Sequence, residues 1–234
     1  MSVDKDHFEL ILVGSDGRMG RALHDAVMKD GACTIIGRID RAHCERPTDV
    51  HHGVVVDFSS ESGTNVAINL AHELQSPILV GTTGLSDDAI KSLEDLARRV
   101  PVAVVANTSL GVMVLQQLIK SVGALLKRTK SVSVELVETH HTGKRDAPSG
   151  TSILLANSLA ESNFNMPHEA IRSLRTGTVV GTHDISFTFG NERLTLSHEA
   201  LDRSLFAEGA INLARLLLHR RPGLYQAEDL LELR

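Results

Sequence analysis

The chain has few aromatic residues, few cysteines and no long apolar run, and each shortage argues against a class of protein. Its 234 residues include no tryptophan, one tyrosine and six phenylalanines, which leaves little for stacking on nucleic-acid bases. Lysine and arginine number 24 against 29 aspartates and glutamates, and the net charge of −5 also argues against a nucleic-acid partner. No stretch approaches the roughly 20 apolar residues of a membrane span. We therefore expect neither nucleic-acid nor membrane binding.

Cysteine is almost absent as well. Cys33 and Cys44 are the only two cysteines, too few for a disulfide scaffold. The N-terminal stretch from Met1 to Phe8 is polar and does not resemble a secretory signal. We therefore expect a cytoplasmic protein, long enough for one large domain or two small ones.

What is present in the first half is an alternation of apolar runs with helical patterns. We expect strands at 8–13, 33–39, 53–58, 77–80 and 102–105. Helices are expected at 21–29, 63–74 and 86–99, the last with Ser86 as its cap. Strands that are almost wholly apolar and alternate with helices predict a parallel sheet covered on both faces.

The pattern changes near Ser109. We expect a helix at 111–126, a strand at 131–138 and a helix at 151–161. Two strands of alternating polarity, 179–189 and 192–198, are joined by Gly190-Asn191 as a hairpin turn. Helices at 207–218 and 226–233 close the chain. The late alternation suggests an open sheet, with one face in water or against another subunit.

A glycine-rich segment, Gly-Ser-Asp-Gly-Arg-Met-Gly at 14–20, joins the first strand to its helix. Glycines there let the turn tighten and a pyrophosphate approach the helix start, although such turns also occur without ligands. Asp16 occupies the position before the middle glycine, so the usual second glycine is displaced by one. Asp40 ends the second strand, where an acid binds a ribose hydroxyl, and Arg41 suits a 2′-phosphate. NADH and NADPH both remain open.

Two further loops fit the same interpretation. Gly-Thr-Thr at 81–83 and Ala-Asn-Thr at 106–108 follow the fourth and fifth strands. In a doubly wound sheet these strand ends line the crevice where a nicotinamide lies. The first half therefore reads as a Rossmann-type dinucleotide-binding domain, followed by a second α+β domain.

The segment 138–151 reads as strand, polar loop and helix start. Pro148 suits the first turn of the helix, and Asp146 or Ser149 is a candidate cap. The amides of Gly150 and Thr151 would then face outward and bind a carboxylate or phosphate.

The same loop carries His140, His141 and Lys144, which would place proton donors beside that anion. A lone pair of loop histidines is more often solvated surface, but here it accompanies a helix start and a nucleotide motif. A metal site is a weak alternative, because adjacent histidines in an extended segment point to opposite sides and the cysteines lie far away. We expect no metal.

The motifs together resemble those of the bacterial dihydrodipicolinate reductases (4-hydroxy-tetrahydrodipicolinate reductases), enzymes of diaminopimelate and lysine biosynthesis. The matching segments occur in family order and cover nearly the whole chain. The most specific is His-His-x-x-Lys-x-Asp-Ala-Pro-Ser-Gly-Thr at 140–151. The segments are 14–20, 56–59, 81–84, 106–112, 138–151, 177–183 and 206–210.

The resemblance implies a Rossmann domain at 1–108, to which 211–234 returns, and a substrate-binding and tetramerisation domain at 109–210. It implies a homotetramer that reduces a dicarboxylate, 4-hydroxy-tetrahydrodipicolinate, to tetrahydrodipicolinate with NADPH or NADH. By position, His140 is the implied proton donor and acceptor, and Lys144 the second proton donor.

The implied substrate contacts are His141, Gly150 and Thr151. The implied cofactor contacts are Gly14, Ser15, Asp16, Gly17, Arg18, Met19, Asp40, Arg41, Gly81, Thr82, Thr83, Val105, Ala106, Asn107 and Thr108.

Several positions depart from the family pattern. Asp16 replaces a small residue, Thr108 stands where some members have an aromatic, and Met113 stands where asparagine is frequent. The segment 41–53 is also short. Arg175, His183 and His198 stay open, as substrate neighbours or structural residues. Two other functions stay open: a dehydrogenase of a different small acid, and a nucleotide-binding homologue without chemistry.

Overall fold

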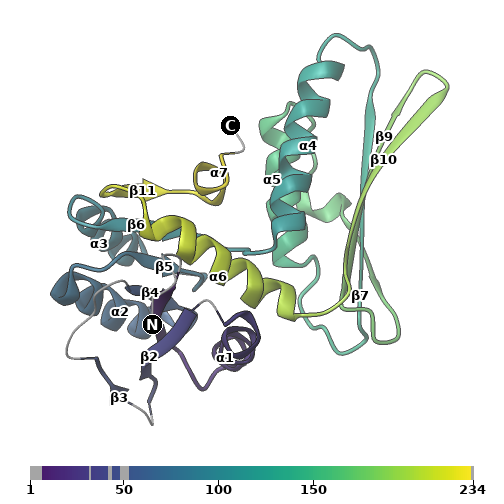
Figure 1. Ribbon diagram of the computed structural model, residues 1–234. Coiled ribbons are helices and arrows are strands. Elements are labelled where there is room, and N and C mark those ends of the chain that lie inside the picture. Colours follow the sequence, from purple (N-terminus) through teal and green to yellow (C-terminus); the bar gives the residue numbers. More distant parts are fainter. Residues whose placement is uncertain (1–6, 32, 42–43, 48–52, 233–234) are drawn as a thin grey trace. The chain divides into compact units, whose positions relative to one another are not determined.

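The computed structural model describes residues 7–31, 33–41, 44–47 and 53–232, which divide into two units (Figure 1). Unit 1 consists of Met1–Ser109 and Ser204–Arg234, and unit 2 of Leu110–Arg203. The expected return at residue 211 falls inside helix α6 (Ser204–Leu218), so the whole helix joins unit 1. The polar N-terminal stretch up to residue 6 and the end of the last expected helix at 233 lie outside the described residues.

Unit 1 is built on a seven-stranded sheet in which β2 and β3 pair antiparallel and all other neighbours are parallel. The order is β11-β6-β5-β4-β1-β2-β3. All five strands expected from the apolar runs are present. The two-residue β3 and the three-residue β11 lie at the edges and were not expected. The strands are β1 (Phe8–Val13), β2 (Cys33–Ile39), β3 (Cys44–Glu45), β4 (Gly53–Asp57), β5 (Ile78–Val80), β6 (Pro101–Val104) and β11 (Gly223–Tyr225).

Helices cover both faces of this sheet. Helices α2 (Glu61–Leu74) and α3 (Asp87–Leu96) contact each other and pack on the face that carries Ile11 and Val55. Leu10 and Leu12 point to the opposite face and are equally buried. Helix α1 (Arg18–Asp30) contacts α6, which also contacts β4, β5, β6 and the short α7 (Ala227–Leu230). The doubly wound α/β fold is confirmed.

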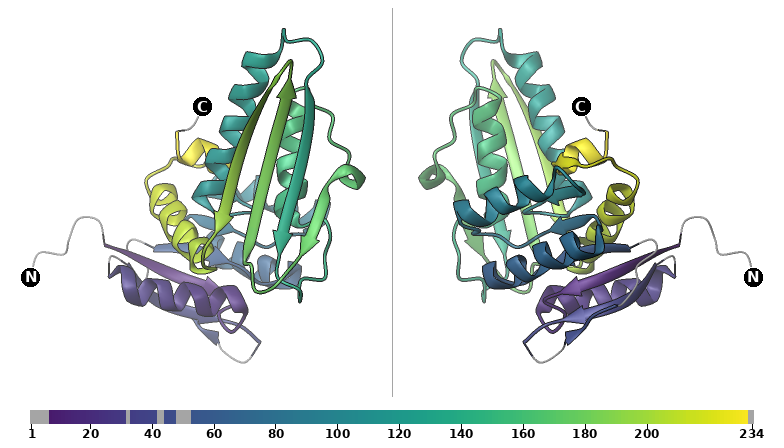
Figure 2. Two further views of the ribbon diagram at one scale, coloured as in Figure 1. Left: turned by 90° about the vertical axis from the view of Figure 1, so that its right-hand side faces the viewer. Right: turned by 90° about the vertical axis from the view of Figure 1, so that its left-hand side faces the viewer.

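Unit 2 has a four-stranded sheet in the order β10-β9-β7-β8, seen face-on in Figure 2. Strands β7 (Ser133–His140) and β8 (Arg172–Arg175) are parallel, and β9 (Gly181–Phe189) is antiparallel to β7 and β10 (Glu192–Ala200). Helices α4 (Leu110–Leu126) and α5 (Gly150–Glu161) bury one face, and a 3₁₀ helix, His168–Ala170, precedes β8. The hairpin turn at Gly190 is confirmed, with φ at 55°.

The face of this sheet that packs against the helices changes from apolar to polar along β7. Leu136 lies opposite Ile185 of β9 in the buried core. Two residues further, Glu138 lies between His183 of β9 and Ser173 of β8. Because side chains two apart on a strand share a face, His140 continues the same polar row. The strand therefore delivers an acid and a histidine to one end of the core.

Candidate functional site

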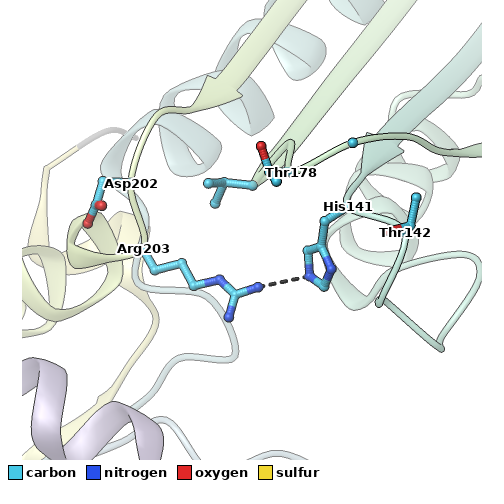
Figure 3. Close-up of a pocket in the computed structure, with 7 residues that line it drawn as sticks. His141, Thr142, Thr178, Asp202 and Arg203 are labelled. Carbon is cyan, nitrogen blue, oxygen red and sulfur yellow. Dashed lines mark hydrogen bonds between the residues drawn. The ribbon is translucent and has the colours of Figure 1, made fainter.

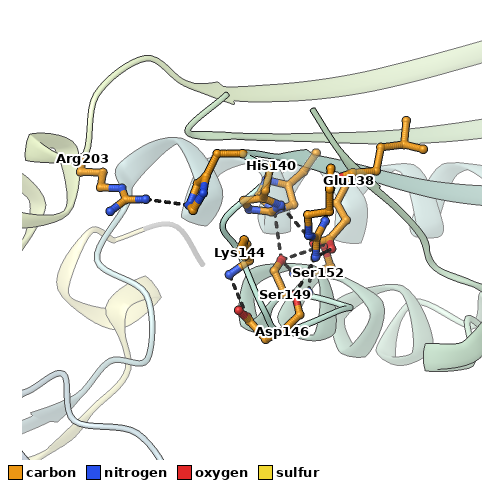
Figure 4. A network of polar contacts seen from close by, with 11 residues as sticks. Glu138, His140, Lys144, Asp146, Ser149, Ser152 and Arg203 are labelled. Atoms are coloured by element: carbon orange, nitrogen blue, oxygen red, sulfur yellow. Dashed lines mark hydrogen bonds and ion pairs between the residues drawn. The ribbon is translucent and has the colours of Figure 1, made fainter. Parts of the chain in front are cut away.

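Glu138 is the centre of a buried polar cluster in unit 2 (Figure 4). The Ser149 amide and the Ser152 hydroxyl donate to its Oε2 at 3.0 and 2.6 Å. Arg175 Nη2 donates to Oε1 at 2.9 Å. Burial alone would raise the pKa of Glu138, but these hydrogen bonds outweigh it and lower the pKa to about 2. The carboxylate is therefore ionised at neutral pH.

His140 lies beside that carboxylate. Its Nδ1 is 3.6 Å from Glu138 Oε2 and has no hydrogen-bond partner among the described residues. Burial lowers the pKa of His140. The negative charge of Glu138 raises this pKa, whereas the positive charges of Lys144 and Arg175 lower it further. A buried histidine whose pKa depends on neighbouring charges in this way is a candidate for acid–base chemistry.

Two of the residues left open from the sequence lie at this cluster. Arg175 is bound to Glu138, and its Nη2 also donates to the Asp146 carbonyl at 2.6 Å. The ring of His183 is 5.3 Å from that of His140 and its Nε2 is 3.4 Å from the Ser149 hydroxyl. Burial, followed by the charge of His140, lowers the pKa of His183 to about 4. His198 is one strand further along, with its ring 6.1 Å from that of His183.

Lys144 projects from the loop that follows β7. Its Nζ donates to Asp146 Oδ2 at 2.8 Å, and this hydrogen bond lowers the pKa of Asp146. Lys144 is also close enough for its charge to act on His140. The loop thus brings together the two residues that the sequence singles out for proton transfer.

The start of α5 corrects part of the sequence interpretation. Ser149, not Asp146, is the N-cap: its hydroxyl accepts from the Ser152 amide at 3.1 Å. Pro148 precedes the cap, so its expected place in the first turn is wrong. The helix begins at Gly150, because the Ser149 hydroxyl accepts from an amide of the first turn. Gly150 is exposed, and nothing lies within 4 Å of the position of a Cβ atom there. Space for a ligand lies over this helix start.

A pocket of about 490 Å³ is lined by His141 and Arg203 (Figure 3). His141 and Arg203 face each other in it, with Arg203 Nη2 2.8 Å from His141 Nε2. Arginine can only donate, so Nε2 accepts and the proton of a neutral His141 is on Nδ1. Arg203, 62 residues away in sequence, was not expected. The other lining residues are Thr142, Gly177, Thr178, Val180 and Asp202.

In unit 1 the glycine-rich loop has the close backbone packing that its sequence predicts. Gly14 has φ at 85°, and a Cβ atom there would lie 2.5 Å from the Phe58 carbonyl oxygen. A Cβ atom at Gly20 would lie 2.3 Å from the Gly14 carbonyl oxygen. Gly17 is the exposed N-cap of α1 and provides no side-chain cap. The first amides of α1 therefore have no side-chain acceptor from the cap, which suits a phosphate.

Asp40 lies against this loop. Its Oδ2 accepts from the Asp16 amide at 3.1 Å, and its Oδ1 from the Arg41 amide at 2.6 Å. Asp16 and Asp40 thus stand together at the carboxyl ends of β1 and β2. Arg18 and Arg41 are exposed. This donor set fits the sugar and phosphates of a dinucleotide.

Of the remaining expected cofactor residues, two use their hydroxyl groups inside the protein. Thr82 donates to Asp57 Oδ2 at 2.9 Å and accepts from the Ser59 amide at 2.9 Å. Thr108 donates to the Phe206 carbonyl at 2.6 Å. Ser15 and Val105 are buried, Met19, Gly81 and Asn107 are half-buried, and Thr83 and Ala106 are exposed.

Glu138, His140 and His183 also place ligand-type atoms within 4.8 Å of one another. Both oxygens of Glu138, however, already accept hydrogen bonds, one of them from the cationic Arg175. A second cation there would face Arg175 and Lys144. The donor chemistry of the cluster therefore fits proton transfer better than a metal ion.

Comparison with known proteins relates both units to one family. Residues 8–108 match the family model "Dihydrodipicolinate reductase, N-terminus", and residues 111–231 match "Dihydrodipicolinate reductase, C-terminus". A 4-hydroxy-tetrahydrodipicolinate reductase from Alkaliphilus oremlandii is 32% identical over 96% of this chain and 99% of its own. One from Stenotrophomonas maltophilia is 36% identical over 95% of this chain and 97% of its own.

Solved structures agree on the fold. A dipicolinate-bound dihydrodipicolinate reductase from Paenisporosarcina sp. TG-14 superposes with a TM-score of 0.77 at 19% identity, over 95% of this chain and 98% of that one. A diaminopimelate dehydrogenase from C. glutamicum gives 0.54 at 10% identity, over 95% and 93%.

Proposed function

The chain belongs to the dihydrodipicolinate reductase family, and from that premise we propose which of its residues carry out the reaction. It is an NAD(P)H-dependent 4-hydroxy-tetrahydrodipicolinate reductase of lysine and diaminopimelate biosynthesis. NAD(P)H, when bound, supplies the hydride. The observation that carries the assignment of roles is the buried cluster at the end of β7, which puts His140 and Lys144 beside an open helix start.

Unit 1 holds the cofactor through its glycine-rich loop and the strand ends around it. The uncapped start of α1 binds the pyrophosphate through the amides that follow Gly17. Asp40 accepts from the ribose hydroxyls of NADH, and Arg41 pairs with the 2′-phosphate of NADPH. Segments 81–83 and 105–108 line the nicotinamide end.

Unit 2 binds the dicarboxylate substrate. The amides of Gly150 and Thr151 bind one carboxylate, which the open space over Gly150 accommodates. Arg203 and His141 bind the other, because a guanidinium offers two parallel donors to a carboxylate. The dipicolinate in the Paenisporosarcina structure is a ligand of the same dicarboxylate class.

His140 supplies the proton. Reduction leaves the substrate ring electron-rich and short of one proton, which a histidine is suited to give near neutral pH. Lys144 offsets the negative charge of the substrate and returns a proton to the site. Asp146 holds Lys144 in place through the 2.8 Å hydrogen bond.

A coupled assay tests these roles. The substrate is generated in situ from pyruvate and aspartate semialdehyde by the preceding synthase, and loss of reduced-nicotinamide absorbance is followed with NADH and with NADPH. We expect oxidation that requires the synthase. Oxidation with a different small acid instead would favour a different dehydrogenase, and binding of the dinucleotide without turnover would favour a non-catalytic homologue.

Two variants separate binding from chemistry in this assay. Arg203→Ala should raise the substrate KM about tenfold or more with a smaller effect on kcat, since it removes one charged contact. Lys144→Ala should lower kcat and raise KM together. An unchanged kcat for Lys144→Ala would leave it as an anchor only.

We further infer a cytoplasmic homotetramer. The face of the unit 2 sheet away from the helices carries hydroxyl pairs such as Ser186–Thr195 at 3.0 Å, a polar surface suited to contact with another subunit. Cys33 and Cys44 are present as thiols, and in the described part of the chain no helix has the length and apolarity needed to cross a bilayer. Light scattering after gel filtration should give four times the mass of one chain, and a monomer would refute the assembly.

A further inference from the structure

Glu138 joins several parts of the cluster in Figure 4. Its side chain has no exposed surface. It binds the Ser149 amide at the start of α5, Arg175 at the end of β8 and, at 3.6 Å, the His140 ring. One carboxylate therefore touches both the helix start that would bind a substrate carboxylate and the histidine that would supply the proton.

The geometry also distinguishes the two nitrogens of the His140 ring. Nδ1 is the nitrogen turned toward Glu138, so Nε2 is turned away from it. Next to Nε2 is the bare backbone of Gly181, where a Cβ atom would lie only 3.0 Å from it. A carboxylate on one imidazole nitrogen sets the tautomer and orientation of the ring and stabilises its protonated form. At 3.6 Å the contact is too long for a hydrogen bond, but it holds the carboxylate charge beside the nitrogen that carries a proton in the imidazolium.

We propose that Glu138 is a positioning residue for the reduction, one that aligns the His140 imidazole with the start of α5 and stabilises the imidazolium. This inference rests on the proposed role of His140 as proton donor. Glu138 acts through His140 and Ser149 and does not itself touch the substrate.

The charges around His140 make the proposal testable by pH. Glu138 precedes it on the same strand, Lys144 and Asp146 lie on the following loop, Arg175 on β8 and His183 on β9. Glu138 is the nearest negative group, at 3.6 Å. Its removal leaves Arg175 and Lys144 without a buried counter-charge, so the protonated form of His140 becomes less favourable.

The experiment compares Glu138→Gln, which removes the charge, with Glu138→Asp, which keeps the charge but shortens the reach. Glu161→Gln is the matched control, because Glu161 is an exposed glutamate of the same unit, at the end of α5 opposite Ser149. The readouts are the NMR titration of the His140 ring, kcat and substrate KM in the coupled assay, and the dissociation constant of NADPH. Circular dichroism checks the fold.

For Glu138→Gln we expect the His140 titration midpoint to move to lower pH and kcat to fall about 10- to 100-fold. A glutamine can accept at only one of the two positions that the carboxylate oxygens occupy, so either Ser149 or Arg175 loses its acceptor. Substrate KM should therefore rise, and NADPH binding should be unchanged. Glu138→Asp should be intermediate in both midpoint and kcat, and Glu161→Gln should match the wild type. A purely structural role would not move the His140 midpoint in a folded variant.

Each outcome bears on one claim. A folded Glu138→Gln with an unchanged His140 midpoint and kcat overturns the positioning role. If Glu138→Gln does not fold, the comparison of Glu138→Asp with the wild type carries the test, and an unchanged midpoint and kcat there overturn it equally. His140→Gln with full turnover would instead refute the proton-donor role, independently of Glu138.

Discussion

The pH dependence of stability should reveal the buried neutral state of His183. Burial and the charge of His140 lower its pKa from the ordinary 6.5 to about 4. Between the two pKa values the unfolded chain takes up a proton that the folded chain does not, and this favours unfolding. The stability that neutral His183 contributes is therefore fully present above pH 6.5 and is lost as the pH falls from 6.5 to about 4. The shift of the His183 pKa corresponds to a loss of at most about 3 to 4 kcal/mol in the free energy of unfolding.

His183→Gln removes this titration while keeping an amide nitrogen to contact the Ser149 hydroxyl. The free energy of unfolding, from urea titrations at a series of pH values between 7 and 4, should fall less steeply in the variant than in the wild type. His168→Gln is the control, because His168 is an exposed histidine of the same unit. Glu138, with its pKa of about 2, loses its contribution mainly below pH 4.5 and does not obscure the window. An identical slope for His183→Gln and the wild type would refute the reasoning.

Three further predictions concern the two units. Asp57 is fully buried and accepts hydrogen bonds from Thr82, Thr64 and Ser59. Asp57→Asn should therefore loosen the loop at 81–83 and weaken NADPH binding about tenfold. An unchanged dissociation constant of NADPH in a fluorescence titration would contradict this. Gly181→Ala would place a Cβ atom 3.0 Å from His140 Nε2. This variant should lower kcat without affecting the dissociation constant of NADPH. A kcat equal to that of the wild type would show that the His140 ring has room to move. If the reaction requires protonated His140, kcat/KM should fall as the pH rises, with a midpoint below 6.5, because burial lowers the pKa of His140 in the free enzyme. The profile of kcat should fall at a higher pH, because the bound dicarboxylate favours the imidazolium. Coincident profiles of kcat and kcat/KM would argue against a protonated His140.

The sequence predicts the elements of the fold well where a local signal exists. The apolar runs give all five main strands of unit 1, and Ser86 caps its helix as expected, with its hydroxyl accepting from the Ala89 amide at 3.3 Å. Strand β8, Arg172–Arg175, has no such signal, because its residues alternate weakly and only pairing with β7 makes it a strand. The sequence left Asp146 and Ser149 both open as the N-cap of α5. Pro148 falls in the first turn only if Asp146 is the cap, and Ser149 is the cap.

The site is predictable only in part for a similar reason. His140, Lys144 and the helix start lie within twelve residues of one another and could be recognised together. Glu138 was visible only as the end of a strand, although its place two residues after buried Leu136 was a usable signal of a charge on the core face. Arg175 and Arg203 reach the site through sheet register and a distant chain segment, which one sequence does not encode locally.

The central claim is that His140 supplies the proton in a reduction driven by NAD(P)H, and one variant tests it most directly. His140→Gln is assayed in the synthase-coupled reaction alongside the wild type, with the dissociation constant of NADPH measured on the same preparations. We predict a loss of kcat of about 100-fold or more with unchanged NADPH binding. Turnover equal to that of the wild type would contradict the account.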